Sequence, residues 1–211
     1  MSARTRFDDV RIAIAKGRIL EQVIPRWRSA GLGWPLAPAS RQLWFKGTRE
    51  GPGGLIVRGP DVPVLVARGA ADLGIVGADL LEEQGPIDVL EVADLDLAIC
   101  RVVLAGVRPE LPDGPFVVAS KYRRITEGYL ARRHFQADIV RLSGSLELAP
   151  LIGLAPYIID IVETGETLRQ HRLNEIEIVM RSHARLIANP AHWRSKPEVV
   201  AIRDRLVHHL A

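Results

Sequence analysis

The chain has 211 residues, of which 47% are hydrophobic and 25% charged, and its formal net charge is +3. This composition excludes a disordered or fibrous protein and predicts one or two globular domains with a sizeable core. The small basic excess is spread along the chain. It therefore favours an anionic small molecule as ligand over a nucleic acid, whose binding grooves carry a dense basic stripe.

Cysteine usage and hydropathy limit the compartment. Cys100 is the sole cysteine in the sequence, which excludes an internal disulfide and favours a reducing environment. The first ten residues, MSARTRFDDV, lack the apolar core of a signal peptide,. No stretch approaches the roughly 18 apolar residues that span a bilayer. We therefore expect a cytoplasmic protein that does not insert into membranes.

The first half of the chain alternates short strands with short helices. Apolar spacing of three and four residues predicts the helices, and short β-branched runs predict the strands. The glycines at 31 and 69 stand where helices end,. Such alternation with short links predicts parallel βαβ units. The expected strands are 10–15, 41–46, 55–58, 72–77 and 89–92, and the expected helices are 19–30, 60–68 and 78–84.

The second half continues the alternation after a long apolar strand, 97–106, that carries the chain into a second lobe. The patterns then predict strands at 116–120, 137–142 and 157–162, with helices at 122–134 and 143–151,. Two further strands, 175–180 and 184–188, are expected to return the chain to the first lobe, where an amphipathic helix over 196–210 ends it.

These elements predict an α/β architecture of two lobes. The chain is expected to cross between them twice, so that residues 1–97 plus 184–211 form a discontinuous first lobe and residues 98–183 form the second. Folds of this kind bind ligands in a central cleft, beyond the carboxyl ends of the strands.

The stretch 157–173, YIIDIVETGETLRQHRL, is the strongest candidate for a binding site. Its first half is typical of a buried strand, and its second half turns through Thr164 and Gly165 into a helix. The first amides of a helix have no partners within it, and together with threonine hydroxyls they favour an anion. We interpret the turn as a phosphate cradle. The alternative is an ordinary strand-to-helix turn.

Two further sets of polar residues lie at predicted strand ends. Lys16-Gly17-Arg18 places two cations between a strand and a helix, where they either bind a polyphosphate or are merely solvated,. Asp160 and Glu163 flank the end of strand 157–162 and suit ribose hydroxyls or a magnesium ion on a diphosphate. A structural role for Asp160 is the alternative, because a carboxylate in an apolar strand needs a partner.

Other polar residues are interpreted as structural. Asp61 and Asp72 suit a helix start and a strand edge, and Cys100 suits a buried, inert thiol. The six histidines show no metal-binding spacing.

Four segments in order resemble the ATP phosphoribosyltransferase family: AIAKGRILE, RGPDVPVLVARGAADLGIVGADLL, LSGSLELAPLIGLA and DIVETGETLRQHRL. The resemblance covers the chain from about Arg11 to Ala211. It implies a two-lobed fold like a type II periplasmic binding protein, and the first reaction of histidine biosynthesis. The length is similar to the short form of the family, which implies a separate regulatory subunit resembling histidyl-tRNA synthetase. A homo-oligomer of this chain is then expected within a hetero-octamer.

The resemblance also implies which residues bind the substrates, ATP and phosphoribosyl diphosphate (PRPP). The PRPP-binding set is Asp160, Glu163, Thr164, Gly165, Glu166, Thr167 and Leu168. The catalytic cations, close to the diphosphate and the triphosphate, are Lys16, Arg18 and Arg41. The set that lines the nucleotide pocket is Arg58, Asp94 and Tyr122. Mg²⁺ is expected on the substrate diphosphate, and no metal ligand is assigned on the protein.

Two alternatives differ in function. One is a solute- or effector-binding module of the same two-lobed shape, against which the lack of a signal segment and of a helix-turn-helix argues. The other is a phosphoribosyltransferase that acts on a different acceptor. This protein is not expected to bind nucleic acid or a membrane.

Overall fold

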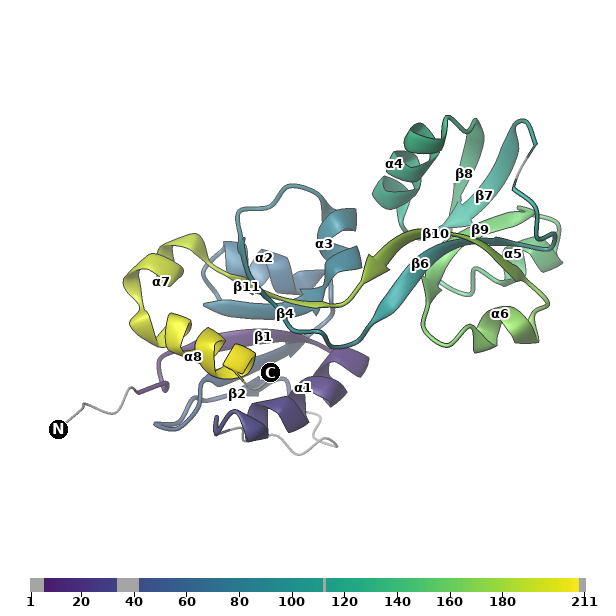
Figure 1. Cartoon of the computed structure of the whole chain (residues 1–211). Helices are drawn as coiled ribbons and strands as arrows, with labels where there is room; N and C mark the ends of the chain where they lie inside the picture. Colours follow the sequence, from purple (N-terminus) through teal and green to yellow (C-terminus); the bar gives the residue numbers. More distant parts are fainter. Residues whose placement is uncertain (1–5, 34–41, 112, 209–211) are drawn as a thin grey trace. The chain divides into compact units, whose positions relative to one another are not determined.

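The computed structural model describes residues 6–33, 42–111 and 113–208 (Figure 1). The chain divides into two compact units, one formed by Met1–Ala98 with His183–Ala211 and the other by Ile99–Ser182. Both units are α/β. Within the described residues, no helix has the length and apolar character that crossing a membrane requires.

Unit 1 is built on a six-stranded sheet whose order is β2-β3-β1-β4-β11-β5. The strands are β1 (Arg11–Ala15), β2 (Trp44–Phe45), β3 (Gly53–Val57), β4 (Leu73–Gly77), β5 (Leu90–Asp94) and β11 (Ala184–Ala188). The helices are α1 (Arg18–Ser29), α2 (Asp61–Ala67), α3 (Ala78–Gln84), α7 (Pro190–Ser195) and α8 (Pro197–His208).

The sheet of unit 1 is mixed. β1 pairs in parallel with β3 and β4, as the βαβ pattern predicts. β2 is antiparallel to β3, and β11 is antiparallel to both β4 and β5. β2 and β11 thus add antiparallel pairs to the parallel βαβ units that the alternation predicts. β11 enters the sheet from the far end of the chain, so its direction does not depend on a βαβ crossover.

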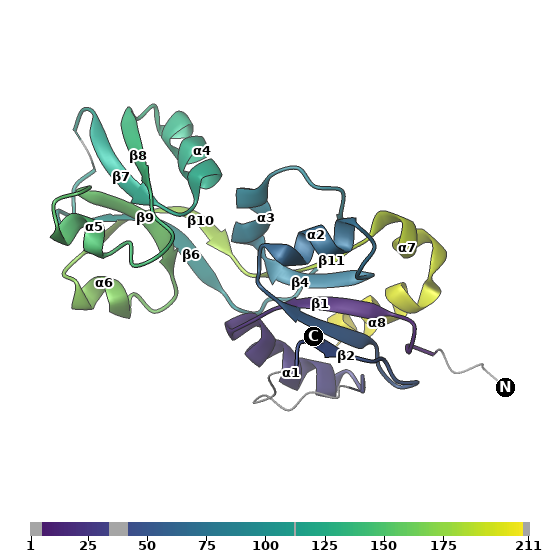
Figure 2. The same ribbon diagram turned by 180° about the vertical axis from the view of Figure 1, so that it is seen from behind.

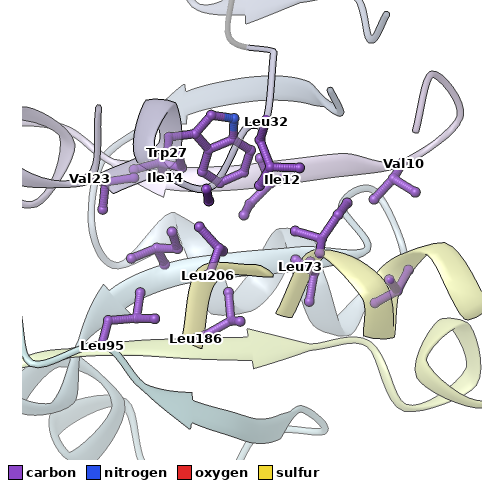
Figure 3. Close-up of a cluster of buried hydrophobic side chains, with 14 of the residues drawn as sticks. Val10, Ile12, Ile14, Val23, Trp27, Leu32, Leu73, Leu95, Leu186 and Leu206 are labelled. Atoms are coloured by element: carbon purple, nitrogen blue, oxygen red, sulfur yellow. The ribbon is translucent and has the colours of Figure 1, made fainter. Parts of the chain in front are cut away.

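Helices cover both faces of this sheet, as the opposite views show (Figure 2). On one face, α1 and α8 pack their apolar sides against the strands through Trp27, Leu73 and Leu206 (Figure 3). On the other face, α2 packs through Val62 and Val66, which are fully buried. Strand residues of unit 1 are thus buried on both sides, which accounts for their continuous apolar runs.

Unit 2 is built on a five-stranded sheet whose order is β10-β6-β9-β7-β8. The strands are β6 (Cys100–Gly106), β7 (Phe116–Ser120), β8 (Ala137–Arg141), β9 (Tyr157–Val162) and β10 (Asn174–Ser182), and the helices are α4 (Arg123–Arg133), α5 (Leu148–Leu151) and α6 (Glu166–Gln170). α5 and α6 contribute to one core cluster with β6 and β9, and α4 lies on the opposite face (Figures 1 and 2).

Two expected elements of the second half differ from the structure, and a third is described only in part. β10 pairs with β6 along most of its length, so it belongs to the sheet of unit 2 and does not return the chain to the first lobe. The helix expected over 143–151 is reduced to the four residues of α5, because Ser145 has a positive φ of 50° that interrupts it. The end of the expected helix 196–210 lies outside the described residues.

Candidate active site

Residues 163–168, which are the turn after β9 and the first three residues of α6, are called here the β9–α6 loop. Gly165 has φ 78° and ψ 4°, a left-handed conformation that a residue with a Cβ adopts only under strain. It turns the chain directly into α6, where buried Leu168 anchors the helix in the core. The Glu166 amide donates to Thr164 Oγ1 at 3.3 Å. Among the described residues the amides of Thr167 and Leu168 have no acceptor. The loop therefore offers free donors beside two exposed hydroxyls.

Two arginines outside the predicted set of site residues hold the backbone of this loop. Arg101 Nη1 donates to the carbonyl oxygen of Glu163 at 2.9 Å, and Arg169 Nη1 donates to that of Thr164 at 3.2 Å. A Cβ at Gly165 would lie 3.5 Å from Arg169 Nη1 and 3.9 Å from Arg101 Nη2. The available signal for Arg101 was a charged residue inside the otherwise apolar strand β6.

Each of these arginines is paired with a carboxylate. Arg101 binds Glu175 in a bidentate manner, from Nε at 2.7 Å and from Nη2 at 2.6 Å. Hydrogen bonding to Arg101 lowers the pKa of Glu175. Arg169 Nη2 lies 2.6 Å from Glu166 Oε2, and this hydrogen bond lowers the pKa of Glu166. The charges around the loop are therefore nearly balanced.

Asp160 lies inside β9, and its carboxylate has two partners. Lys121 Nζ lies 3.1 Å from Asp160 Oδ1, and the amide of Ile161 donates to the same oxygen at 2.7 Å. The side chain is 23% exposed, so it is neither a free surface acid nor an unpaired buried one. A partly exposed carboxylate beside a cation suits a hydroxyl ligand, and it also suits a purely structural ion pair.

Tyr122 is 3% exposed, and its position is fixed through the backbone. Its amide donates to Ser120 Oγ at 3.0 Å, and that hydroxyl donates to the carbonyl oxygen of Ile159 at 2.7 Å. Lys121 Nζ lies 4.9 Å from the centroid of the Tyr122 ring. The structure thus brings Tyr122, Lys121 and Asp160 together beside β9.

Lys16 and Arg18 lie where β1 passes into α1 in unit 1. The Lys16 amide donates to the carbonyl oxygen of Val57 at 2.8 Å, which leaves the exposed side chain beyond the strand end. Gly17 has φ 85° and makes the bend between the two cations. Arg18 Nη2 donates to the carbonyl oxygen of Ala98 at 2.8 Å. Arg18 is therefore held by the segment that leads out of unit 1.

Arg58 and Asp94, two further predicted residues of unit 1, lie at strand ends. Arg58 follows β3 and is exposed, and its carbonyl oxygen accepts from the amide of Asp61 at 3.0 Å. Asp94 ends β5, with its Oδ2 at 2.6 Å from His183 Nε2 and 3.5 Å from Arg185 Nη1. Arg41 lies outside the described residues.

Asp72, interpreted from the sequence as structural, is fully buried in unit 1. Its Oδ2 accepts from the amide of Arg11 at 2.7 Å, and its Oδ1 contacts His192 Nδ1 at 2.8 Å and the ammonium of Lys196. These contacts tie β1 and β4 to the C-terminal helices. Asp72 therefore has a stabilising position away from the predicted substrate residues.

A separate hollow of about 640 Å³ lies between α4 and β8 in unit 2. Its described lining consists of Arg123, Glu127, Leu130, Phe135, Gln136, Ala137, Asp138, Ile139 and Arg141. The predicted site residues are not among them. The arrangement instead concentrates the predicted PRPP-binding residues on one strand and the turn that follows it.

Solved structures of low identity share the architecture. The chain aligns with the periplasmic VFT2 domain of BvgS from Bordetella pertussis at a TM-score of 0.59 and 14% identity, over 96% of this chain and 88% of that one. A substrate-binding protein of an amino acid ABC transporter aligns at a TM-score of 0.56 and 9% identity, over 93% and 91%. The fold is thus the two-lobed α/β class found in periplasmic binding proteins.

Comparison at the level of sequence is more specific. The family model described as ATP phosphoribosyltransferase matches residues 58–210. An ATP phosphoribosyltransferase of Alcanivorax borkumensis is 39% identical over 203 residues, 95% of each chain. One from Pseudomonas putida is 44% identical over 186 residues, 87% of this chain and 88% of that one. The HisG:HisZ ATP phosphoribosyl transferase complex of Thermotoga maritima contains a chain that aligns at a TM-score of 0.80 and 30% identity, over 95% and 98%.

The chain belongs to the ATP phosphoribosyltransferase family, the pentosyltransferases of the first step of histidine biosynthesis. The resemblance stated from four sequence segments is confirmed, and so is the two-lobed α/β fold that it implied.

Proposed function

We propose that the β9–α6 loop binds the 5-phosphate of PRPP, and that this chain joins C1 of PRPP to N1 of ATP with release of diphosphate. The observation that carries the proposal is the conformation of Gly165, which turns a buried strand directly into a helix start. The donors are amides of this loop, those of Thr164, Gly165, Thr167 and Leu168, together with the hydroxyls of Thr164 and Thr167. An anion at such a helix start is stabilised by both hydrogen bonds and the helix dipole.

Asp160 and Glu163 are proposed to bind the ribose hydroxyls of PRPP. The support is their place in the chain, since Asp160 lies within β9 and Glu163 begins the loop. A sugar held at both its phosphate and its hydroxyls has C1 in a fixed position. Fixed geometry of this kind is a large part of catalysis in bimolecular reactions.

Lys16, Arg18 and Arg41 are proposed to bind the diphosphate of PRPP and the triphosphate of ATP. The support for the first two is their position at the end of β1, on both sides of the bend at Gly17. Two polyanions repel each other in water, so cations are needed both to bring them together and to stabilise the charge on the leaving group.

Arg58, Asp94 and Tyr122 are proposed to contact the nucleotide, and Mg²⁺ is proposed to accompany the diphosphate. The described residues contain no cluster of three or more His, Cys, Asp or Glu side chains suited to a metal ion. Oxygens of the substrate phosphates are ligands that Mg²⁺ prefers, with one or two carboxylates added. Asp160 and Glu163 are the carboxylates of this chain that fit that role, and the ion would supply neutralising charge.

The proposed reaction is a direct displacement. N1 of ATP attacks C1 of PRPP with inversion, the bond from C1 to the diphosphate oxygen breaks, and the electron pair leaves with diphosphate. The chain needs no nucleophile of its own for this reaction. Its residues orient the two substrates and stabilise the departing charge.

We also propose a regulatory partner that resembles histidyl-tRNA synthetase, assembled with a homo-oligomer of this chain as a hetero-octamer in the cytoplasm. The HisG:HisZ composition of the related Thermotoga maritima complex supports a partner of this kind. Co-expression followed by light scattering tests the stoichiometry.

The reaction is tested by incubating the chain with ATP, PRPP and Mg²⁺, with and without the regulatory subunit, and following the absorbance of the N1-substituted adenine. We expect product that depends on both substrates. Binding of PRPP without turnover in either condition would instead identify a binding module. Turnover with a free base in place of ATP would identify a different phosphoribosyltransferase.

A further inference from the structure

We infer that Arg101 is a positioning residue for the reaction, which orients the amides of the β9–α6 loop toward the phosphate of PRPP. The inference rests on the proposed role of this loop. In this role Arg101, which lies on β6, fixes the direction in which the loop donates its hydrogen bonds.

The position of Arg101 follows from the sheet of unit 2. β6 pairs antiparallel with β9, and Arg101 lies directly opposite Val162, the last residue of β9. Opposite residues in a sheet project from the same face. Val162 and Leu168 belong to the core cluster on that face. The guanidinium therefore reaches the loop where it leaves the sheet.

The contact with Glu163 orients a peptide plane. Arg101 Nη1 donates to the carbonyl oxygen of Glu163 at 2.9 Å. In a trans peptide the carbonyl and the following N–H point in opposite directions, and the described residues contain no cis peptide bond. Fixing the Glu163 carbonyl toward Arg101 thus turns the amide of Thr164 away from it. Arg169 does the same for the next plane, through the carbonyl oxygen of Thr164 at 3.2 Å.

Arg101 is the more firmly held of the two arginines. Glu175 on β10 binds its guanidinium from Nε and Nη2 at 2.7 and 2.6 Å, and the two side chains are only 26% and 29% exposed. Arg169 and its partner Glu166 are 64% and 57% exposed. A bidentate pair on two strands of one sheet fixes the orientation of the guanidinium plane. The sheet therefore fixes the guanidinium of Arg101, and the guanidinium in turn fixes the direction of the Glu163 carbonyl.

This arrangement predicts that Glu175→Gln weakens PRPP binding, which is opposite to the change expected from charge alone. The substitution removes a negative charge near a site for a polyanion, so electrostatics alone would tighten PRPP binding. If Glu175 serves to hold Arg101, the same substitution weakens binding, because the guanidinium can move away from the Glu163 carbonyl. The two explanations differ in the direction of the effect.

The test measures KM for PRPP and for ATP in initial-rate assays, in the complex with the regulatory subunit, and PRPP affinity of the chain by calorimetry. For Glu175→Gln we expect a rise in KM for PRPP of about 5-fold or more, and for Arg101→Gln about 10- to 100-fold, the worth of one charge-assisted hydrogen bond. KM for ATP should change less than about 2-fold, since the loop binds PRPP alone.

Arg101→Lys separates position from charge. An ammonium keeps the charge but cannot bind a carboxylate in bidentate fashion and a carbonyl at once. On a logarithmic scale, we expect Arg101→Lys to reverse less than half of the rise in KM for PRPP that Arg101→Gln causes. Arg123→Gln is the matched control, because Arg123 also donates from Nε to a glutamate, Glu127, at 2.7 Å but does not touch the loop. We expect wild-type constants for it.

Glu175→Gln decides the inference even if Arg101→Gln fails to fold. A KM for PRPP within 2-fold of wild type, or below it, overturns the positioning role. Full rescue by Arg101→Lys also overturns it and leaves Arg101 as a simple counter-charge. Thr167→Ala tests the loop itself in the same assay. If Thr167→Ala raises KM for PRPP but the Arg101 and Glu175 variants do not, the loop still binds the phosphate and only the role of Arg101 is lost. If it has no effect, the loop is not the phosphate site.

Discussion

Arg18 donates a hydrogen bond from Nη2 to the carbonyl oxygen of Ala98 at 2.8 Å, and Gln22, one turn further along α1, accepts from the Ala98 amide at 2.7 Å. Ala98 has a positive φ of 53°, a conformation that costs a residue with a Cβ about 1–2 kcal/mol. Both polar groups of this strained residue are therefore satisfied by side chains of α1. Arg18, a proposed catalytic residue, thus also stabilises the backbone where the chain leaves unit 1 at Ala98.

Arg18→Ala should abolish most turnover while the protein stays folded. Removing one donor to a developing negative charge typically lowers kcat by about 100-fold or more, and we expect kcat/KM to fall by that amount. The lost hydrogen bond to Ala98 should lower the free energy of unfolding by only about 1 kcal/mol.

Arg28→Ala is the control for that variant, because Arg28 is exposed in the last turn of the same helix. Its kinetics should match wild type. Near wild-type turnover in Arg18→Ala itself, measured at saturating and limiting PRPP, would remove Arg18 from the proposed mechanism.

Ala98→Gly should stabilise the protein slightly or leave it unchanged. Glycine adopts positive φ without strain, a gain of about 1–2 kcal/mol, and the greater freedom of the unfolded chain offsets about 0.4–1 kcal/mol of it. Ala131→Gly, at an exposed position in α4, should instead lose about 1 kcal/mol. Chemical unfolding of both variants checks the difference in sign. A loss at position 98 as large as at 131 would contradict the strain argument.

Elements with an apolar pattern were predictable from the sequence. The strand Tyr157–Val162 and the helix Ala78–Gln84 have the expected bounds, because each is framed by turn residues. Strand direction was not predictable for β10 and β11, whose partners β6 and β4 lie far away in the sequence. Such long-range pairing leaves no mark on local periodicity.

The short helix α7 was missed although its start carries a recognisable signal. Asn189 caps it by accepting from the amides of Ala191 and His192, at 3.0 and 3.1 Å, and Pro190 follows the cap. A capping residue followed by proline is typical of a helix start. The signal was present, but six residues are too few to show an apolar face.

The loop of the candidate site was recognisable because its chemistry is local, with threonines and a glycine between a strand and a helix. The residues that orient it were not recognisable, since Arg101 and Glu175 are separated from it in sequence and meet it only in the sheet of unit 2. The same holds for Lys121 beside Asp160. The sequence therefore indicated the candidate binding groups, and the structure shows which side chains hold them in place.

Gly165→Ala should weaken PRPP binding more than it weakens folding. The added Cβ would meet only ordinary contacts, at 3.5 Å and beyond, so its effect comes from the positive φ of 78°. The loop can relieve about 1–2 kcal/mol of strain by shifting its amides, and KM for PRPP should rise by about 10-fold.

Gly128→Ala is the matched glycine control, within helix α4 and with open space for a Cβ except near the end of Arg132. It should raise the free energy of unfolding by about 0.5–1 kcal/mol and leave KM for PRPP unchanged. Equal kinetics for the two alanine variants would show that the conformation of Gly165 does not matter for binding.

The pair of Arg101 and Glu175 should make stability depend on acid pH. Hydrogen bonding to Arg101 lowers the pKa of Glu175 below the ordinary glutamate value of 4.5. Its contribution is therefore fully present above about pH 4.5 and is lost as the pH falls through the lowered folded-state pKa. The difference in unfolding free energy between wild type and Glu175→Gln should shrink as the pH falls below 4.5. Urea unfolding at pH 7 and at pH 3 checks this, and a constant difference would contradict it.

Asp72→Asn should destabilise the protein without changing its substrate kinetics. Asp72 is fully buried and joins the Arg11 amide to His192 and Lys196. Removing one member of a buried charged network costs about 3–5 kcal/mol when the other charges stay buried. We expect about 2–3 kcal/mol here, because Lys196 is 33% exposed and can turn toward water,. Asp61→Asn, at the exposed start of α2, should lose less than about 1 kcal/mol. If Asp72→Asn changes KM for ATP or PRPP at a temperature where it is fully folded, Asp72 does more than stabilise unit 1.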